Sequence, residues 1–270
     1  MLVDGLIEKD LQRDGYAIVG KIGEDELLQL VEFHQGMKRD GTDFYYSLLN
    51  NGYSVNKEIL DTQKAILKPF FEAHFSNYRT ITESYLIKPA QTENELQIHQ
   101  DWCYTDEQKY EAYNVWIPLT DVNEENGALF FLKGSHLWFS NKRSGSLPTA
   151  RISSKNDTIA RNIVTANLQK GEVILFSPAV FHGSWPNRSM EDRVIISTTV
   201  LDIDAPFLYY QKASDNEVDF FHLDDERFIK DLEPLTRGES PSPEPNGRIS
   251  YKHLIVTEEM IAKKLADQDQ

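Results

Sequence analysis

The chain has 270 residues, 40% of them hydrophobic and 11% aromatic, which is enough apolar material to bury one substantial core and excludes a disordered or coiled-coil protein. Its 28 basic and 43 acidic residues give a net charge of −15, so no basic field attracts nucleic-acid phosphates or anionic lipids. We therefore expect no nucleic-acid partner and no membrane partner.

The sequence favours a cytoplasmic protein. The longest apolar run is residues 128–132, far short of the roughly 20 residues that span a bilayer. The first ten residues carry four charges where a secretion signal would need an apolar stretch. The single cysteine, Cys103, cannot form an internal disulfide, so any metal must be bound by nitrogen and oxygen ligands.

The amino-terminal region is predicted to be mostly helical. A short β-prone run occupies residues 16–19. Apolar side chains that recur every three or four residues predict an amphipathic helix over about 23–38. A second helix is predicted over about 54–67, with the Ser54 hydroxyl as its cap and Pro69 as its interruption.

From residue 80 to 202 the pattern changes to short β-rich runs separated by turn signals, as in a β-sandwich or barrel. The expected strands are 85–88, 96–104, 113–119, 128–132, 172–176, 180–185 and 194–201. Residues 138–167 lack a clear period, so we predict a long loop over the mouth of the barrel.

The sequence predicts one domain over residues 1–270, with a mostly helical support (1–79), a β core (80–202) and an acidic carboxy-terminal cover (203–270). The cover holds 15 acidic and 8 basic side chains. Its proline-containing segment 238–247 favours extended backbone, so we expect partial order with one terminal helix from about Thr257.

Three residues have the chemistry and spacing of a metal site. His99 and Asp101 are two residues apart in a predicted strand, so both side chains project from the same face. His182 lies on another predicted strand. Two imidazoles and one carboxylate on one side of an ion leave three coordination positions open, the arrangement that non-haem Fe(II) oxygenases use to bind an organic chelate and O₂.

A second His-x-Asp sequence serves as an internal control. His222-Leu-Asp224 has no arginine after it in a β-prone run, whereas His182 is followed by Arg193 at the start of a strongly β-prone segment. A buried guanidinium needs an anionic partner, because burying it alone costs several kcal/mol. The expected anion at Arg193 is a co-substrate carboxylate, held bidentately.

These residues belong to an ordered set of motifs over roughly residues 80 to 202. The set is His99-x-Asp101, residues 116–121 leading to 125–129, Gly134-Ser-His136, residues 171–176, and residues 182–189 with Arg193. Together they resemble the phytanoyl-CoA dioxygenase family. The resemblance implies a double-stranded β-helix (a cupin-like jelly roll), mainly β with flanking helices, and Fe(II) with 2-oxoglutarate as co-substrate.

The resemblance also implies roles for single residues. The metal ligands of the family match His99, Asp101 and His182. The arginine that binds the distal carboxylate of 2-oxoglutarate matches Arg193, and positions lining the 2-oxoglutarate pocket match Ser184, Trp116 and Tyr85.

The expected activity is hydroxylation of an unactivated C–H bond in a small organic molecule, an amino acid or a specialised metabolite, with O₂ consumed and succinate and CO₂ released. A coenzyme A ester is not expected, because it is polyanionic and the chain is acidic. The aromatic residues expected near the mouth are Trp102, Tyr104, Trp138 and Trp185. Two alternatives stay open: a non-catalytic jelly roll that binds a metal or small acid, and the same cofactors serving desaturation, cyclisation or epimerisation.

Overall fold

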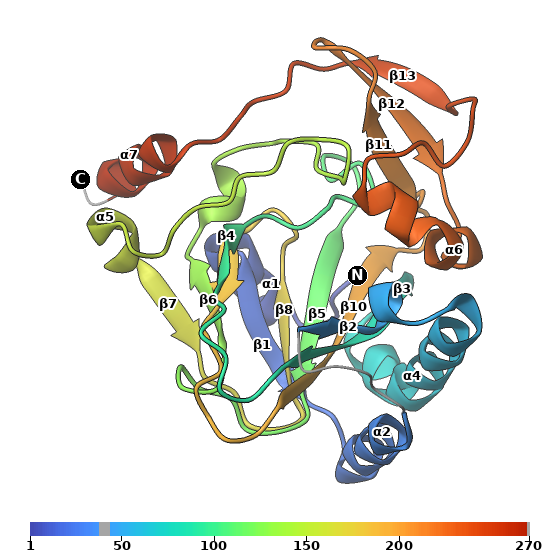
Figure 1. Cartoon of the computed structure of the whole chain (residues 1–270), viewed down its shortest axis with the longest axis vertical. Coiled ribbons are helices and arrows are strands. Elements are labelled where there is room, and N and C mark those ends of the chain that lie inside the picture. Colours follow the sequence, from blue (N-terminus) through green and yellow to red (C-terminus); the bar gives the residue numbers. More distant parts are fainter. Residues whose placement is uncertain (38–43, 269–270) are drawn as a thin grey trace.

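The β-prone runs assemble into two antiparallel sheets in the computed structural model, which describes residues 1–37 and 44–268 (Figure 1). The six-stranded sheet has the order β1-β8-β5-β10-β3-β2, and the four-stranded sheet has the order β4-β9-β6-β7. In both sheets, neighbouring strands are mostly not consecutive in the sequence. Two such antiparallel sheets, facing each other, form the predicted jelly roll.

The large sheet consists of β1 (Tyr16–Lys21), β2 (Tyr45–Tyr46), β3 (Tyr78–Lys88), β5 (Ala112–Pro118), β8 (Glu172–Phe176) and β10 (Arg193–Asp202). The small sheet consists of β4 (Leu96–His99), β6 (Leu129–Leu132), β7 (Ile163–Ala166) and β9 (His182–Ser184). The expected strand over 96–104 is therefore too long, since β4 ends at His99.

Alternation along β10 shows how the layers are built. Ile195 packs between the two sheets with Trp116 and Phe131, whereas its neighbours Val194 and Ile196 pack on the opposite face against the helices. Successive strand residues point to opposite faces, so this one strand contributes to both layers of the core. The interior between the sheets is thus apolar up to the edge where the polar site residues begin.

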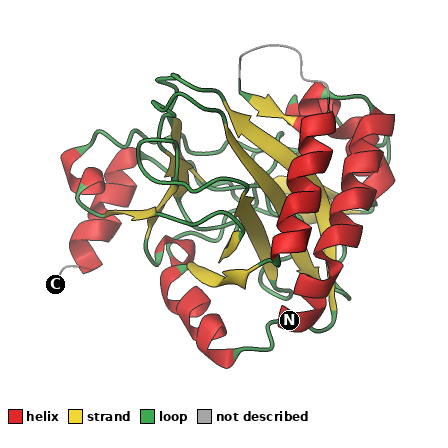
Figure 2. Cartoon of the chain, turned by 90° about the horizontal axis from the view of Figure 1, so that it is seen from below, coloured by secondary structure: helices red, strands yellow, loops and turns green. Residues whose placement is uncertain are grey.

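Helices cover the outer face of the large sheet (Figure 2). They are α1 (Gly5–Asp14), α2 (Glu24–Gly36), α3 (Ser47–Asn50) and α4 (Tyr53–His74). The amphipathic helix predicted over 23–38 is α2, although Lys38 lies outside the described residues. Leu30 of α2 and Leu67 of α4 are fully buried in the shared cluster.

The prediction that Pro69 interrupts the second helix is wrong, because α4 continues to His74. Proline inside a helix costs about 3 kcal/mol. Phe70 and Phe71 follow it directly and are buried in the helix–sheet core, and burying two phenylalanine side chains contributes about 3–6 kcal/mol. The predicted Ser54 cap is also wrong: the helix starts after Gly52, without a side-chain cap.

The segment predicted as an irregular loop, residues 138–167, contains regular structure. It includes the short helix α5 (Asp157–Ala160) and the strand β7, which pairs with β6 and completes the small sheet. The turn η1 (Ser135–Leu137) precedes it. Strand β7 has only four residues, so it is too short to show a period in the sequence.

The acidic tail is more ordered than expected. It forms a three-stranded sheet of β11 (Leu208–Lys212), β12 (Glu217–His222) and β13 (Gly247–Ser250), the helix α6 (Asp225–Thr236) and the predicted terminal helix, α7 (Glu258–Gln268). Leu232 of α6 is buried in one cluster with Leu48 of α3 and Leu60 of α4. Asp224, from the second His-x-Asp sequence, caps α6 by accepting from the Arg227 backbone N–H at 2.7 Å.

Nowhere in the described part of the chain is a helix both long enough and apolar enough to cross a membrane.

We predict that the tail and the jelly roll unfold as one domain. Phe228 of α6 is 1% exposed and contacts the rings of Tyr104 and Phe207. Phe228→Ala should lower the free energy of unfolding by about 3–5 kcal/mol in a single urea transition. Ile255→Ala, at a side chain that is 68% exposed, should change it by less than about 0.5 kcal/mol. Two separate transitions would contradict the single domain.

Candidate active site

The pairing of β4 with β9 brings two histidines face to face. His99 and His182 are Cα partners in the antiparallel register, and their ring centroids lie 4.5 Å apart. Asp101 follows β4, where its backbone N–H donates to the Pro178 carbonyl at 2.9 Å. Its Oδ1 lies 3.3 Å from His99 Nε2, and its Oδ2 lies 3.4 Å from His182 Nε2. One ligand atom from each residue falls within 4.8 Å of the others.

Backbone carbonyls set the tautomer of both imidazoles. The Gln97 carbonyl lies 2.8 Å from His99 Nδ1, and the Val180 carbonyl lies 3.0 Å from His182 Nδ1. A carbonyl only accepts, so each Nδ1 carries the hydrogen and each Nε2 keeps a free lone pair. Burial lowers the pKa of His182 to about 4, so that imidazole is neutral at pH 7. Both Nε2 atoms therefore suit a metal ion.

A polar chain holds the carboxylate of Asp101. Asn114 of β5 donates from Nδ2 to Asp101 Oδ2 at 2.6 Å, and Thr199 of β10 donates to Asn114 Oδ1 at 2.9 Å. Thr82 of β3 lies at the end of this chain, 3.1 Å from the Thr199 hydroxyl. Burial opposes ionisation of Asp101, but His182 and His99 outweigh it and hold the pKa of Asp101 well below its usual range.

Sequence reasoning missed Asn114. Its only signal in the sequence was an amide side chain at the start of an otherwise apolar β run.

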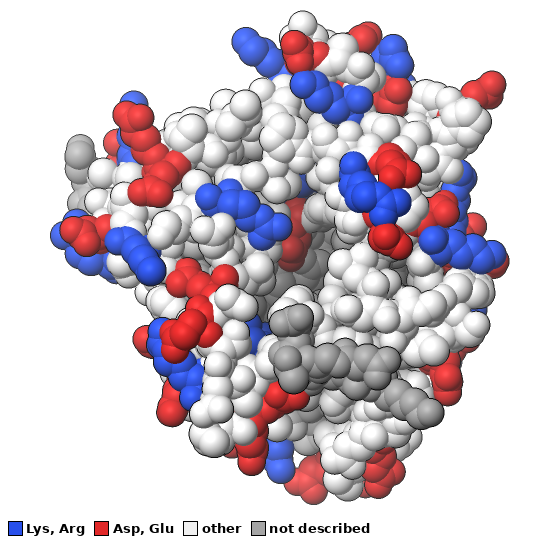
Figure 3. All heavy atoms as spheres, in the orientation of Figure 1, with Lys and Arg blue, Asp and Glu red and all other residues white. Residues whose placement is uncertain are grey.

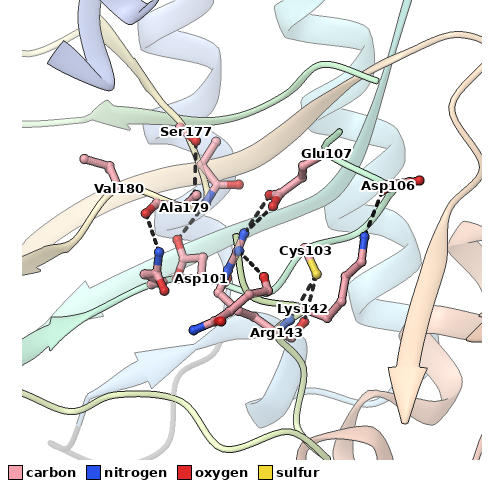
Figure 4. Close-up of polar contacts among 12 residues, drawn as sticks. Asp101, Cys103, Asp106, Glu107, Lys142, Arg143, Ser177, Ala179 and Val180 are labelled. Atoms are coloured by element: carbon pink, nitrogen blue, oxygen red, sulfur yellow. Dashed lines mark hydrogen bonds and ion pairs between the residues drawn. The ribbon is translucent and has the colours of Figure 1, made fainter. Parts of the chain in front are cut away.

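Buried Arg143 holds the backbone next to the triad (Figure 4). Its Nε donates to the Asp101 carbonyl at 2.6 Å, and its guanidinium binds Glu107 through two contacts of 2.6 and 2.7 Å. The Arg143 backbone N–H donates to Cys103 Sγ at 3.1 Å. Burial raises the pKa of Cys103 to about 11, so the thiol stays protonated at pH 7.

Two buried cations lie side by side on neighbouring strands. Arg193 of β10 is the register partner of Lys88 of β3, and each is 3% exposed. Arg193 Nε has no hydrogen-bond partner, and the guanidinium carbon lies 5.3 Å from the centre of the Trp116 ring. Lys88 Nζ donates to the Ser184 hydroxyl at 2.7 Å. Within the described ranges, no carboxylate forms an ion pair with either cation.

Both pKa values show the cost of this arrangement. Burial lowers the pKa of Arg193 to about 9. Burial, with the adjacent charge of Arg193, lowers the pKa of Lys88 to about 7. A bound anion would relieve this cost, so the pair marks a candidate anion site. Sequence reasoning identified Arg193 and missed Lys88, whose pairing with Arg193 depends on the strand register.

The expected role of Tyr85 in the pocket is not supported by its position. Tyr85 is fully buried against α2, and its hydroxyl donates to the Leu30 carbonyl at 3.0 Å. Alternation along β3 sends Tyr85 and Ile87 toward the helices, while the neighbouring Leu86 lines the pocket. A shift of one residue in a strand reverses the face of a side chain, which explains the error.

A pocket of about 320 Å³ opens beside the triad. Figure 3 shows the molecule hollowed near the middle of this face. The lining includes His99, Asp101, His182 and Trp116, as well as residues that the sequence reasoning did not identify: Tyr46, Asn114, Thr149, Arg151, Leu232 and Thr236. Of the four aromatic residues expected at the mouth, Trp102 and Tyr104 line the pocket, whereas Trp138 and Trp185 pack against Phe181 and Phe130.

The sheets, the triad and the buried arginine agree with a comparison against known families. The model of the family described as phytanoyl-CoA dioxygenase matches residues 11–195. The chain belongs to this family. The match includes the triad and Arg193, and it ends within β10, before the carboxy-terminal sheet and α6.

Individual relatives are more distant than the family match. A curated relative, Dioxygenase olcK of Penicillium canescens, is 26% identical over 195 residues, covering 69% of this chain and 59% of that protein. The chain spans about half of the length of the curated relatives it matches.

Solved structures share the fold. EvdO2 from Micromonospora carbonacea var. aurantiaca, complexed with 2-oxoglutarate, matches with a TM-score of 0.54 and 15% identity over 75% of this chain and 94% of that one. The epimerase SnoN, in complex with Fe3+, alpha ketoglutarate and nogalamycin RO, matches with a TM-score of 0.51 and 20% identity over 75% of this chain and 84% of that one. At these identities the likeness concerns the fold alone.

We predict that Asn114→Ala weakens metal binding about 10–100-fold, because a carboxylate that loses its hydrogen-bonding partner loses its orientation. Anaerobic titration calorimetry with Mn²⁺ would measure the change. Ser197→Ala is the matched control, since Ser197 lines the same pocket and its hydroxyl makes no hydrogen bond to the triad in the described residues. Equal Mn²⁺ affinity in wild type and Asn114→Ala would contradict the prediction.

Proposed function

We propose that this member of the phytanoyl-CoA dioxygenase family is an Fe(II)- and 2-oxoglutarate-dependent oxygenase. The observation that carries the proposal is the convergence of His99, Asp101 and His182 at one wall of a pocket, with both Nε2 atoms free. The complexes of EvdO2 with 2-oxoglutarate and of SnoN with Fe3+ and alpha ketoglutarate support it by analogy.

The donor set fits ferrous iron. Two neutral imidazoles and one carboxylate would occupy three adjacent positions and leave three open toward the pocket. When bound, the iron would supply the O₂ chemistry that converts 2-oxoglutarate to succinate and CO₂ and places the second oxygen atom in the product. The protein contributes the position and orientation of the reactants.

The buried cations fit the distal carboxylate of 2-oxoglutarate. Arg193, with an unpartnered Nε, would donate to it directly. Ser184 accepts from Lys88, so its own hydroxyl hydrogen is free to donate to the same carboxylate. Trp116, beneath the guanidinium, restricts the direction in which Arg193 can point. These three side chains would fix the co-substrate at the closed end of the site.

The proposed outcome is hydroxylation of a C–H bond in a small organic substrate, an amino acid or a specialised metabolite. Asp101 would occupy the position that a halide needs, so chlorination is not expected. The name of SnoN, an epimerase, makes epimerisation on the same site the second candidate. Product analysis by mass spectrometry and chiral chromatography separates the two outcomes, since an epimer has the mass of the substrate.

We predict succinate formation by wild-type protein supplied with Fe(II), 2-oxoglutarate and O₂. Alanine at His99, Asp101 or His182 should abolish metal binding or turnover. Arg193→Ala should keep iron and raise the Kd of 2-oxoglutarate about 10–100-fold, the effect of losing a hydrogen bond between charged groups. Arg161→Ala, an exposed arginine beyond α5, is the control. Wild-type behaviour of all four site variants would refute the proposed site.

We predict that 2-oxoglutarate binds less tightly as the pH rises from 6 to 8. Lys88, with a pKa of about 7, loses its positive charge over this range, while Arg193, with a pKa of about 9, keeps its own. The affinity should fall by up to about tenfold per pH unit above 7, one proton being bound with the anion. Glu95 also acts on Lys88 and favours its charged form.

Titration calorimetry of the Mn²⁺-loaded protein at pH 6, 7 and 8 would check this pH dependence. Lys88→Met should flatten the profile. Lys133→Met, at a half-exposed lysine paired with Asp14, should leave the slope intact. A pH-independent Kd in wild type would contradict the assignment of Lys88 to the anion site.

A further inference from the structure

We propose that the primary substrate is a small organic acid with an apolar or aromatic body, and that Arg151 binds its carboxylate. This inference rests on the proposed function, since it assigns the substrate end of the same pocket. Arg151 lines that pocket together with the triad. It lies in the segment 138–167, outside the sequence motifs that carried the family resemblance.

Arg151 is unusual among the arginines of the chain. In the described ranges, every arginine except Arg151 and Arg193 donates a hydrogen bond to a carboxylate or a backbone carbonyl. In a protein with a net charge of −15, an unpaired guanidinium is not explained by a shortage of carboxylates. Both lie at the candidate site: Arg193 is buried against Trp116, a residue that lines the pocket, and Arg151 is exposed and lines the pocket itself.

The backbone holds Arg151 in place. Its neighbour Ile152 forms an isolated bridge with Ile98 of β4, through hydrogen bonds of 3.0 Å and 2.9 Å. Ile98 directly precedes His99, and Ile152 directly follows Arg151. The bridge between Ile98 and Ile152 therefore holds the backbone of Arg151 close to the triad.

Among the described residues that line the pocket, no other cation competes for a substrate anion. Besides the two histidines, the charged lining residues are Asp101, which faces the imidazoles, and Arg151. The remaining wall at the mouth is aromatic or uncharged and includes Trp102 and Tyr104, with Leu232 from α6. One cation beside aromatic, aliphatic and uncharged polar side chains fits a molecule with one anionic group and an apolar body.

The test uses protein loaded with Mn²⁺ and 2-oxoglutarate under anaerobic conditions, so that binding is measured without turnover. The probes are three acids, 3-phenylpropanoate, indole-3-propanoate and cyclohexylpropanoate, each paired with its neutral amide. Titration calorimetry should show at least one acid binding at least tenfold more tightly than its amide. Arg151→Gln should abolish that preference, and Arg151→Lys should retain part of it. Arg161→Gln, the matched exposed arginine, should keep it.

Reversing the charge at position 151 should produce a gain of binding, which a misfolded variant would not show. Arg151→Glu should bind 3-phenylpropylamine more tightly than wild type does, because the mouth then carries an anion. Equal affinity for acid and amide in all three pairs, or no gain for the amine, would overturn the inference. A higher Kd for 2-oxoglutarate in Arg151→Gln would also overturn it, by assigning Arg151 to the co-substrate. Failure of wild type to bind Mn²⁺ and 2-oxoglutarate would instead refute the proposed function.

Discussion

The antiparallel register of β4 and β9 fixes the two imidazoles, and the rest of the site depends on it. A slip of one residue would turn either His99 or His182 to the opposite face of the small sheet. Gly183 permits the close approach of the strands. A Cβ there would lie 2.4 Å from the Leu96 carbonyl oxygen and 2.5 Å from the Phe130 ring, so a side chain would force β9 away from its neighbours. The spacing of the triad is thus a property of sheet packing.

The charged side chains near His99 and His182 differ in whether they have a partner. Asp101 accepts a hydrogen bond from Asn114, and Arg143 binds Glu107 and two backbone carbonyls. Arg193 and Lys88 are buried without a counter-ion among the described residues, which raises the energy of the unliganded protein. An anion that binds only the folded state would stabilise it in proportion to the logarithm of its concentration over its Kd. The same imbalance that destabilises the empty site therefore favours binding of the co-substrate.

The sequence predicted those parts of the fold and site that depend on local pattern. β-rich runs between turn signals identified most of the jelly-roll strands, and the i, i+2 spacing grouped His99 with Asp101. The errors arose where distant partners decide the outcome. Burial of Phe70 and Phe71 carries α4 past Pro69, and the strand register places Lys88 beside Arg193. Neither effect can be predicted from a short stretch of sequence, because each depends on contacts with distant parts of the chain.

Segments inside and outside the family match together line the pocket. The family match ends at residue 195, yet Leu232 and Thr236 of α6 line the pocket together with Thr149 and Arg151 of the 138–167 segment. Helix α6 is held there by its own buried face, which packs in one cluster with α3 and α4. The candidate metal ligands lie on or next to the paired strands β4 and β9, whereas this part of the mouth comes from α6 and from the 138–167 segment. In the proposed site, the residues that would contact the substrate and those that would hold the metal therefore come largely from different segments of the chain.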